Sequence, residues 1–344
     1  MRKLRVLAFM DEDLVPPDDV KGISEEEMEP WRTEWDVVST LRAMGHEVLK
    51  LGLRDELAPL RAAVETWKPD IAFNILEEFQ GEATYDYLVV SYLESMGMAY
   101  TGCNPRGLIL ARDKALSKKL LAYHRVRTPD FAVFPINRKG RRPKRLKFPL
   151  IVKSLVEEAS LGISQASVVE SDEKLAERVE FIHKSIKTDA LVEKYVEGRE
   201  LYVGVLGNQQ LQVLPVWELV FNNMPADAPL IATRRVKWNR AYQKKRGIES
   251  RAAKDLPEGI EKEIVKLSKR VYRILGLSGY ARLDYRMSPE GHLHLLEVNP
   301  NPQVAKGEDL ADSAEAAGVG YETLLQKIIN IGLNRPAQAP AGMA

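Results

Sequence analysis

The segment 280–302 limits the fold of this chain more than any other, because it sets acidic side chains opposite one another. Two short strand-like runs flank a turn at 288–291. Pairing the runs about this turn brings Asp284 within about one residue step of Glu297, roughly 5 to 8 Å across the ladder. Facing carboxylates repel one another, so we expect a cation between them.

An amide and a guanidinium accompany these carboxylates. Asn299 shares the face of Glu297, and Arg282 shares the face of Asp284, because alternate side chains of a strand point the same way. Oxygen ligands of this kind suit Mg²⁺, and a Mg²⁺ site with few carboxylates usually also holds substrate phosphates. The hairpin therefore predicts a site for a divalent cation and a phosphorylated substrate.

The composition is that of an ordinary globular protein. The chain has 344 residues, enough for two or three domains, and a net charge of +1, which gives no strong field for nucleic acid or a membrane surface. No apolar run approaches the ~18 residues of a membrane span. The single cysteine, Cys103, permits no internal disulfide and fits a reducing compartment. We therefore expect a cytoplasmic protein without nucleic-acid or membrane partners.

The range 1–110 alternates strand and helix signals. Apolar runs at Leu4–Met10, His46–Leu51 and Asp70–Ile75 are separated by helical patterns. Short strands that alternate with helices predict a parallel, doubly wound layer. We expect this range to form an N-terminal α/β domain.

The pattern changes after residue 110. A strand at 148–154 and a helix at 172–186 predict a central domain over 111–190. The range 191–335 holds further strands, a strongly periodic helix at 258–275 and the metal-site hairpin, and it predicts a C-terminal domain.

Four stretches carry weaker signals. The range 163–169 reads as a strand, and 221–257 is polar, basic and irregular. The basic run 138–147 favours a solvated hairpin loop over a nucleic-acid patch, because no aromatic residues interleave it. The tail 336–344 is rich in Pro, Ala and Gly, and we expect it to be disordered.

Two further segments each allow two interpretations. Lys153 ends an apolar strand, so it either reaches solvent or places its cation on a nucleotide phosphate, with the small-residue loop 155–162 covering the phosphates. The segment 193–200 is either an exposed hairpin of mixed charge or a hinge whose backbone meets adenine and whose Glu200 meets ribose.

Six segments, in a fixed order, resemble one enzyme family. They are TGCNPRGLILARDKALSK, FPLIVK with EEASLGIS, LVEKYVEGRELYV, VKWNR, GYARLDY and LLEVNPNP. In this order the chain resembles an ATP-grasp ligase, and within that superfamily the D-alanine–D-alanine ligase branch. The resemblance covers nearly the whole chain. It implies a three-domain ATP-grasp fold, with the N-terminal α/β layer followed by two α+β domains that clasp ATP.

The resemblance also implies roles for individual residues. Lys237 would reach the terminal phosphate, and Arg282 would face the reacting carbonyl oxygen. Two Mg²⁺ ions, with Mn²⁺ as the alternative metal, would be held by Asp284, Glu297 and Asn299. The implied ATP-binding residues are Lys114, Lys153, Ser160, Leu161, Gly162, Glu193, Lys194, Tyr195, Val196 and Glu200.

The implied reaction joins a small-molecule carboxylate to an amine. ATP first converts the carboxylate to an acylphosphate, because a carboxylate is a poor electrophile, and the amine then displaces phosphate to leave a peptide or peptide-like amide. Arg282 would stabilise the tetrahedral oxyanion by roughly 3 to 4 kcal/mol. The loop 155–162 would exclude water from the acylphosphate. The family also implies a homodimer.

The chain departs from the dipeptide ligases at both substrate positions. The GGxSxE motif that follows their first strand is absent, and FMDEDLVPPDD stands there. Glu308 falls where a serine of those ligases meets the second substrate's carboxylate, and a carboxylate at this place would repel that group. These departures argue against a true D-alanine–D-alanine ligase.

Candidate substrate residues follow from these departures. Glu77, Glu78 and Glu82 lie past a strand end, where they either bind an ammonium group or favour the start of the next helix. Lys306 and Glu308 either select the second substrate or belong to a solvated loop. The basic region 234–251 is either a lid over ATP or ordinary packing.

Two other functions stay open beside the ligase. An activated carboxylate could pass to a thiol or hydroxyl, or the chain could bind a nucleotide without turnover. The second function has nothing in its favour, because the lysines and the metal-site residues that the resemblance implies are all in place.

Overall fold

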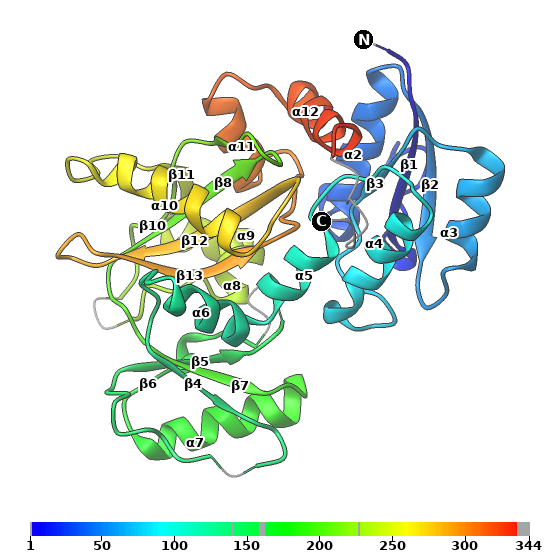
Figure 1. Ribbon diagram of the computed structural model, residues 1–344. Helices are drawn as coiled ribbons and strands as arrows, with labels where there is room; N and C mark the ends of the chain where they lie inside the picture. Colours follow the sequence, from blue (N-terminus) through cyan, green and yellow to red (C-terminus); the bar gives the residue numbers. More distant parts are fainter. Residues whose placement is uncertain (1, 139, 158–161, 226–227, 336–344) are drawn as a thin grey trace, which may run out of the picture.

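A computed structural model describes residues 2–138, 140–157, 162–225 and 228–335, and Figure 1 shows their path. Among them, no helix combines the length and the apolar character needed to cross a membrane. The predicted disordered tail, 336–344, lies outside the described residues, as do Ser160 and Leu161. The α-helices are α1 Glu25–Met28, α2 Arg32–Ala43, α3 Ala58–Ala62, α4 Asp86–Ser95, α5 Pro105–Arg112, α6 Lys114–Tyr123, α7 Asp172–Phe181, α8 Arg234–Trp238, α9 Arg240–Arg246, α10 Ile260–Ile274, α11 Asp309–Ala316 and α12 Tyr321–Leu333.

The N-terminal sheet is parallel, as the sequence predicts. β1 (Arg5–Asp11) lies between β2 (Glu47–Leu53) and β3 (Ile71–Asn74). The odd-numbered apolar residues of β1 pack with α3 and α4, whereas the even-numbered ones pack with α2 and α12. Both faces of β1 are therefore buried, which explains why its sequence is a continuous apolar run rather than an alternating one.

The largest sheet is antiparallel and lies in the C-terminal half of the chain. Its order is β11-β10-β8-β12-β13, with β9 paired to β8. The helix α10 covers one face through residues three to four positions apart, including Ile260, Ile264 and Val271. The strands are β8 Arg199–Leu206, β9 Gln212–Val213, β10 Trp217–Phe221, β11 Ile248–Ala252, β12 Tyr280–Met287 and β13 Leu293–Asn299.

A smaller antiparallel sheet lies between the other two sheets in sequence, and Figure 1 shows it at one end of the molecule. Its order is β4-β7-β5-β6, and α7 packs on it through Leu175 and Val179. The strands are β4 Phe131–Phe134, β5 Leu150–Ser154, β6 Val168–Val169 and β7 Ala190–Lys194. The parallel layer and the two antiparallel sheets confirm the predicted mixed α/β class.

The exposed-hairpin interpretation of 193–200 is wrong. β7 belongs to the smaller sheet and β8 to the largest sheet, so residues 195–198 carry the chain from one sheet to the other. Gly198 has a φ of +125°, and a Cβ added there would lie 1.9 Å from the carbonyl oxygen of Met287. The crossing therefore requires glycine at this position.

The irregular structure predicted for 221–257 is also wrong, because this range holds α8, α9 and β11. Both helices begin at a side-chain cap: Thr233 accepts from the N–H of Val236, and Asn239 accepts from the N–H of Tyr242. α8 and α9 have only five and seven residues. Helices this short cannot develop the apolar period by which longer helices are predicted.

Two shorter predictions need correction as well. In the range 163–169 only Val168 and Val169 form a strand. The basic run 138–147 does not close a hairpin, because β4 and β5 each pair with β7 and not with one another. The pattern of 138–147 is that of a local hairpin, whereas β4 and β5 both find their partner in β7, at residues 190–194.

Candidate functional site

The hairpin of β12 and β13 places its two carboxylates face to face, as predicted. Asp284 is the direct partner of Glu297 across the ladder, and Arg282 is the partner of Asn299. The register shifts immediately after Asp284. The pairing passes from Glu297 to Leu295, so Leu296 is an extra residue in β13, as in a β-bulge.

Arg282 holds Asp284 through two hydrogen bonds. Its Nε and Nη2 donate to the two carboxylate oxygens over 2.8 and 2.9 Å, and the amide of Asn299 donates to the same carboxylate over 3.3 Å. Burial raises the pKa of Asp284 to about 6, the charge of Arg282 opposes this rise, and the charge of Glu297 adds to it. Asp284 is therefore held in place but is costly to ionise without a further cation.

The pKa of Glu297 shifts in the opposite direction to that of Asp284. Burial would raise its pKa, but the positive charges of Lys114, Lys153 and Lys237 outweigh that effect and bring the pKa to about 2. The Nζ of Lys114 lies 3.8 Å from the carboxylate, and a quarter of the Glu297 side chain remains exposed. Glu297 is thus an ionised carboxylate whose oxygens remain accessible from the cavity.

A buried cluster of ion pairs includes one of these lysines, Lys153, together with Lys118 and Glu193. Glu193 on β7 accepts Lys118 of α6 at 2.7 Å and Lys153 of β5 at 2.7 Å. Lys118 also donates to the backbone carbonyl of Leu296, next to Glu297. The two lysine charges hold the pKa of Glu193 below its usual range although burial opposes them. The sequence analysis missed Lys118, whose only signal is its position one helical turn after Lys114.

Replacing Glu193 by glutamine should lower the free energy of unfolding by about 2 kcal/mol, because two buried lysines lose the negative charge of their ion-pair partner. Unfolding in urea measures this loss. The matched control is Glu177→Gln, since Glu177 forms an exposed pair with Lys174 and its loss should cost less than about 1 kcal/mol. Equal urea midpoints for Glu193→Gln and Glu177→Gln would contradict a stabilising role for the buried ion pairs of Glu193.

Glu200 is also paired. Arg286 of β12 donates to one of its carboxylate oxygens over 2.7 Å, and the hydroxyl of Tyr202 donates to the other over 2.8 Å. Glu200 lines a narrow cavity of about 60 Å³ together with Lys153, Lys237, Asp284 and Glu297. The structure therefore brings five of the predicted ATP and metal residues around one space between the two antiparallel sheets.

Four other predicted ATP residues are not among the described residues that line this space. Lys194, Tyr195 and Val196 are half-buried where the chain leaves β7. The Nζ of Lys194 donates to the carbonyl oxygen of Phe148 over 3.1 Å. Gly162, the first described residue after the phosphate-loop gap, has a φ of +73°. The adenine contact predicted for the crossing at 195–198 stays a prediction.

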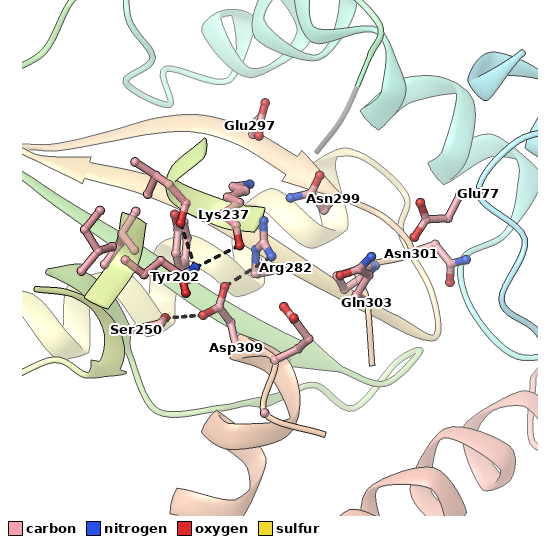
Figure 2. Close-up of a pocket in the computed structure, with 17 residues that line it drawn as sticks. Glu77, Tyr202, Lys237, Ser250, Arg282, Glu297, Asn299, Asn301, Gln303 and Asp309 are labelled. Carbon is pink, nitrogen blue, oxygen red and sulfur yellow. Dashed lines mark hydrogen bonds and ion pairs between the residues drawn. The ribbon is translucent and has the colours of Figure 1, made fainter. Parts of the chain in front are cut away.

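A second, wider cavity of about 310 Å³ opens beside Arg282. Figure 2 shows Lys237, Arg282 and Asn299 on one side of it and Glu77 reaching in from the N-terminal layer. Asp309, at the start of α11, lies with its carboxylate 3.5 Å from Arg282 Nη1 and also accepts from the hydroxyl of Ser250. The described lining residues that the sequence analysis missed include Asp309, Ser250, Asn301, Gln303 and Gln243.

The predicted lid region forms one wall of this cavity. Lys237 of α8 and Gln243 of α9 line it, and Arg240 of α9 pairs with Glu25 at 3.3 Å and Glu29 at 3.1 Å. The two glutamates belong to the segment between β1 and α2. The basic region 234–251 therefore touches the N-terminal part of the chain across the cavity.

A third cavity, of about 480 Å³, adjoins the second and shares Glu77, Gln303 and Glu308 with it. Glu78 also lines this space. Glu82 and Lys306 are exposed and do not occur among the described lining residues of either cavity. Of the predicted substrate residues, the structure thus gathers three around the cavities and leaves two outside.

Glu34 lines the third cavity and is only 4% exposed. The sequence analysis missed it because a glutamate inside α2 gives no signal of its own. Burial raises its pKa to about 8, and the charges of Glu77 and Asp11 add to the rise. Burial likewise raises the pKa of Glu308 to about 7, with Asp309 adding to the rise.

The raised pKa of Glu34 predicts a pH dependence of stability. Unfolded glutamate has a pKa near 4.5, so the folded state binds this proton more tightly, and stability falls as pH rises from about 4.5 to 8. Glu34→Gln removes this loss and should stabilise the protein by about 2 kcal/mol more at pH 8 than at pH 5. Unfolding in urea at both pH values tests this. The control Glu26→Gln, at an exposed residue, should change the free energy of unfolding by the same small amount at both pH values.

Comparisons with known proteins agree with this geometry. Residues 119–330 match the family model described as D-ala D-ala ligase C-terminus. The D-alanine–D-alanine ligase of Aquifex aeolicus is 30% identical over 309 residues, which cover 90% of this chain and 97% of that protein. An uncharacterised protein of Sinorhizobium fredii, y4sG, is 31% identical over 322 residues, which cover 89% of this chain and 90% of that protein.

Solved structures show the same fold. The crystal structure of a D-alanine–D-alanine ligase from Bacillus anthracis complexed with ATP has a TM-score of 0.71 at 24% identity, and the match covers 96% of this chain and 97% of that one. The family model spans more than half of the chain, and relatives at about 30% identity span nearly all of it. The chain therefore belongs to the D-alanine–D-alanine ligase family of ATP-grasp proteins.

Proposed function

We propose that this protein is an ATP-dependent carboxylate–amine ligase that forms a peptide or peptide-like amide. The observation that carries the proposal is the pairing of Asp284 with Glu297 beside Arg282, with three lysines grouped around Glu297. A site with two carboxylates, an arginine and several lysines suits the transfer of a phosphoryl group to a carboxylate. The named activities of the relatives support the same reaction type.

In the first step a carboxylate oxygen of the acid substrate attacks the γ-phosphorus of ATP. The new O–P bond forms as the bond to the bridging oxygen breaks, and ADP leaves. Lys114, Lys153 and Lys237 lower the pKa of Glu297 with their charges, and we assign these charges to the phosphate oxygens of ATP. Glu193 positions Lys153 through an ion pair, and it also pairs with Lys118.

The oxygen donors at the hairpin fit Mg²⁺. Asp284, Glu297 and Asn299 would hold it, and a site with so few carboxylates is typical of Mg²⁺ bound together with substrate phosphates. Among the described residues, no three His, Cys, Asp or Glu side chains are grouped so that they could hold a metal ion by themselves, so substrate phosphates would have to complete the coordination. When bound, Mg²⁺ neutralises charge on the phosphoryl group in transfer. We propose two ions, with Mn²⁺ as the alternative metal.

In the second step the amine nitrogen attacks the acyl carbon. The C–N bond forms, the bond from carbon to the phosphate oxygen breaks, phosphate leaves, and the nitrogen loses a proton. Arg282 lines the wider cavity, where the acyl carbon would lie, and its guanidinium would stabilise the oxyanion of the tetrahedral intermediate. The region 234–251 would cover the site and limit the access of water to the acylphosphate.

The other predicted properties remain part of the proposal. We propose domains at 1–110, 111–190 and 191–335, a cytoplasmic location, a homodimer and small-molecule substrates without nucleic acid. D-alanine–D-alanine ligation is the second candidate, because several relatives carry that name. Glu308 and Asp309 count against it, since they face the wider cavity with carboxylates.

The test separates activation of the acid from the choice of amine. The protein is incubated with ATP, Mg²⁺ and single acids, namely D- and L-alanine, glycine and β-alanine, with hydroxylamine as the acceptor. Hydroxamate formed together with ADP supports an acylphosphate. Release of ADP with pairs of amino acids, dependent on both partners, then supports the ligase. Failure to form hydroxamate or ADP with any acid would overturn the proposal.

A further inference from the structure

Two carboxylates stand at the start of α11, beside the wider cavity. Asp309 is engaged by Arg282 and Ser250, whereas among the described residues no side chain forms a hydrogen bond or ion pair with the carboxylate of Glu308. Glu308 lines both the wider cavity and the adjoining third cavity. An amine substrate that reacts beside Arg282 must therefore present its other end to Glu308 or pass close to it.

Glu34 is a second carboxylate that a cationic ligand would neutralise. Glu34 enters the third cavity from α2 and is only 4% exposed. In the described part of the chain, no other residue forms an ion pair or hydrogen bond with its carboxylate. A buried carboxylate without a cationic partner is costly, because its charge has lost its hydration. A cationic ligand in the cavity would supply that partner.

The lining of the third cavity holds more acidic than basic residues. Three basic residues also line it, but Arg112 is bound by Asp86 at 2.6 Å and Arg32 is bound by Glu29 at 3.2 Å. Arg234 is the remaining described base in the lining. The acidic lining residues are Glu29, Glu34, Glu77, Glu78, Glu157 and Glu308. A cavity of this kind would repel a free carboxylate and attract an ammonium group.

We propose that the amine substrate carries a second ammonium group, as a diamine or polyamine does, and that Glu308 and Glu34 bind this group in the third cavity. The inference rests on the proposed ligase function and names the class of its amine substrate. The reacting amine lies beside Arg282, and the distal ammonium extends past Glu308. A substrate with a carboxylate in place of that ammonium is excluded by charge.

The experiment compares amines that differ only in their far end. The acid that gives the most hydroxamate is held fixed, and amide formation is measured with 1,4-diaminobutane, 1-aminobutane and 4-aminobutanoate. The three-carbon and five-carbon diamines bracket the length. We expect kcat/KM for the best diamine to exceed that of 1-aminobutane by at least about tenfold, or about 1.4 kcal/mol. We expect 4-aminobutanoate to be poorer still.

Variants then assign the effect to the two glutamates. Glu308→Gln and Glu34→Gln should each lower the ratio of the diamine rate to the 1-aminobutane rate by about tenfold. The ratio cancels any general loss of folded enzyme. Glu315→Gln is the matched control, because Glu315 is an exposed residue of the same helix α11, and it should leave the ratio unchanged.

The possible results distinguish a failure of the diamine proposal from a failure of the proposed ligase function. Equal rates with 1-aminobutane and 1,4-diaminobutane, or a preference for 4-aminobutanoate or D-alanine, would overturn the inference. Hydroxamate formation without any amide from the diamines would also overturn it while acid activation stands. If no acid yields hydroxamate or ADP, the proposed function itself fails.

Discussion

Replacing Glu297 by glutamine should lower ATP-dependent hydroxamate formation by at least about a thousandfold, equivalent to about 4 kcal/mol of activation free energy. Glutamine keeps the shape of the side chain but removes the negative charge. That charge lies opposite Asp284 in the hairpin and within the field of Lys114, Lys153 and Lys237. Without it, one oxygen donor of the proposed Mg²⁺ site is neutral and the lysines lose their shared counter-ion.

A binding measurement makes this result specific to the proposed metal. The affinity for ATP is measured by calorimetry at increasing Mg²⁺ concentrations. The wild-type protein should bind ATP more tightly as Mg²⁺ rises, and Glu297→Gln should weaken that dependence. Glu290→Gln is the control, because Glu290 lies in the exposed turn of the same hairpin. Undiminished activity of Glu297→Gln would remove Glu297 from the metal site.

The sequence predicts this hairpin well because its determinants are local. A turn with glycine at 291 and two runs of strand residues determine the pairing within one residue step. The parallel N-terminal layer is predicted for a similar reason, since strands buried on both faces are continuous apolar runs. The apolar runs of both features are local signals, although one face of β1 is covered by α12, at residues 321–333.

Features built from distant segments are not predictable in this way. The crossing at 195–198 resembles a hairpin locally, but β7 and β8 find their partners in different sheets. Lys118 and Glu34 are ordinary polar residues of helices, and only the packed fold shows that each is buried beside the site. Their burial depends on β5, β7 and the N-terminal layer, which no short sequence window contains. The ion-pair cluster and the acidic cavity therefore follow from the structure alone.

Replacing Arg282 by alanine should lower kcat by about 10²- to 10³-fold, the usual loss when one donor to a developing oxyanion is removed. Arg282→Lys should recover only part of this activity, because a lysine keeps the charge but lacks the planar fork that now holds Asp284 by two hydrogen bonds. Steady-state kinetics with the best acid and amine give kcat and KM separately for both variants.

The division between kcat and KM tests the role of Arg282. An interaction made only in the transition state lowers kcat and kcat/KM by the same factor. Arg282 also supports the buried Asp284, so the unfolding midpoint of each variant must be measured before the rates are compared. Arg273→Ala is the control, because Arg273 is exposed on α10. A raised KM with an unchanged kcat would instead assign Arg282 to binding the acid substrate's carboxylate in the ground state.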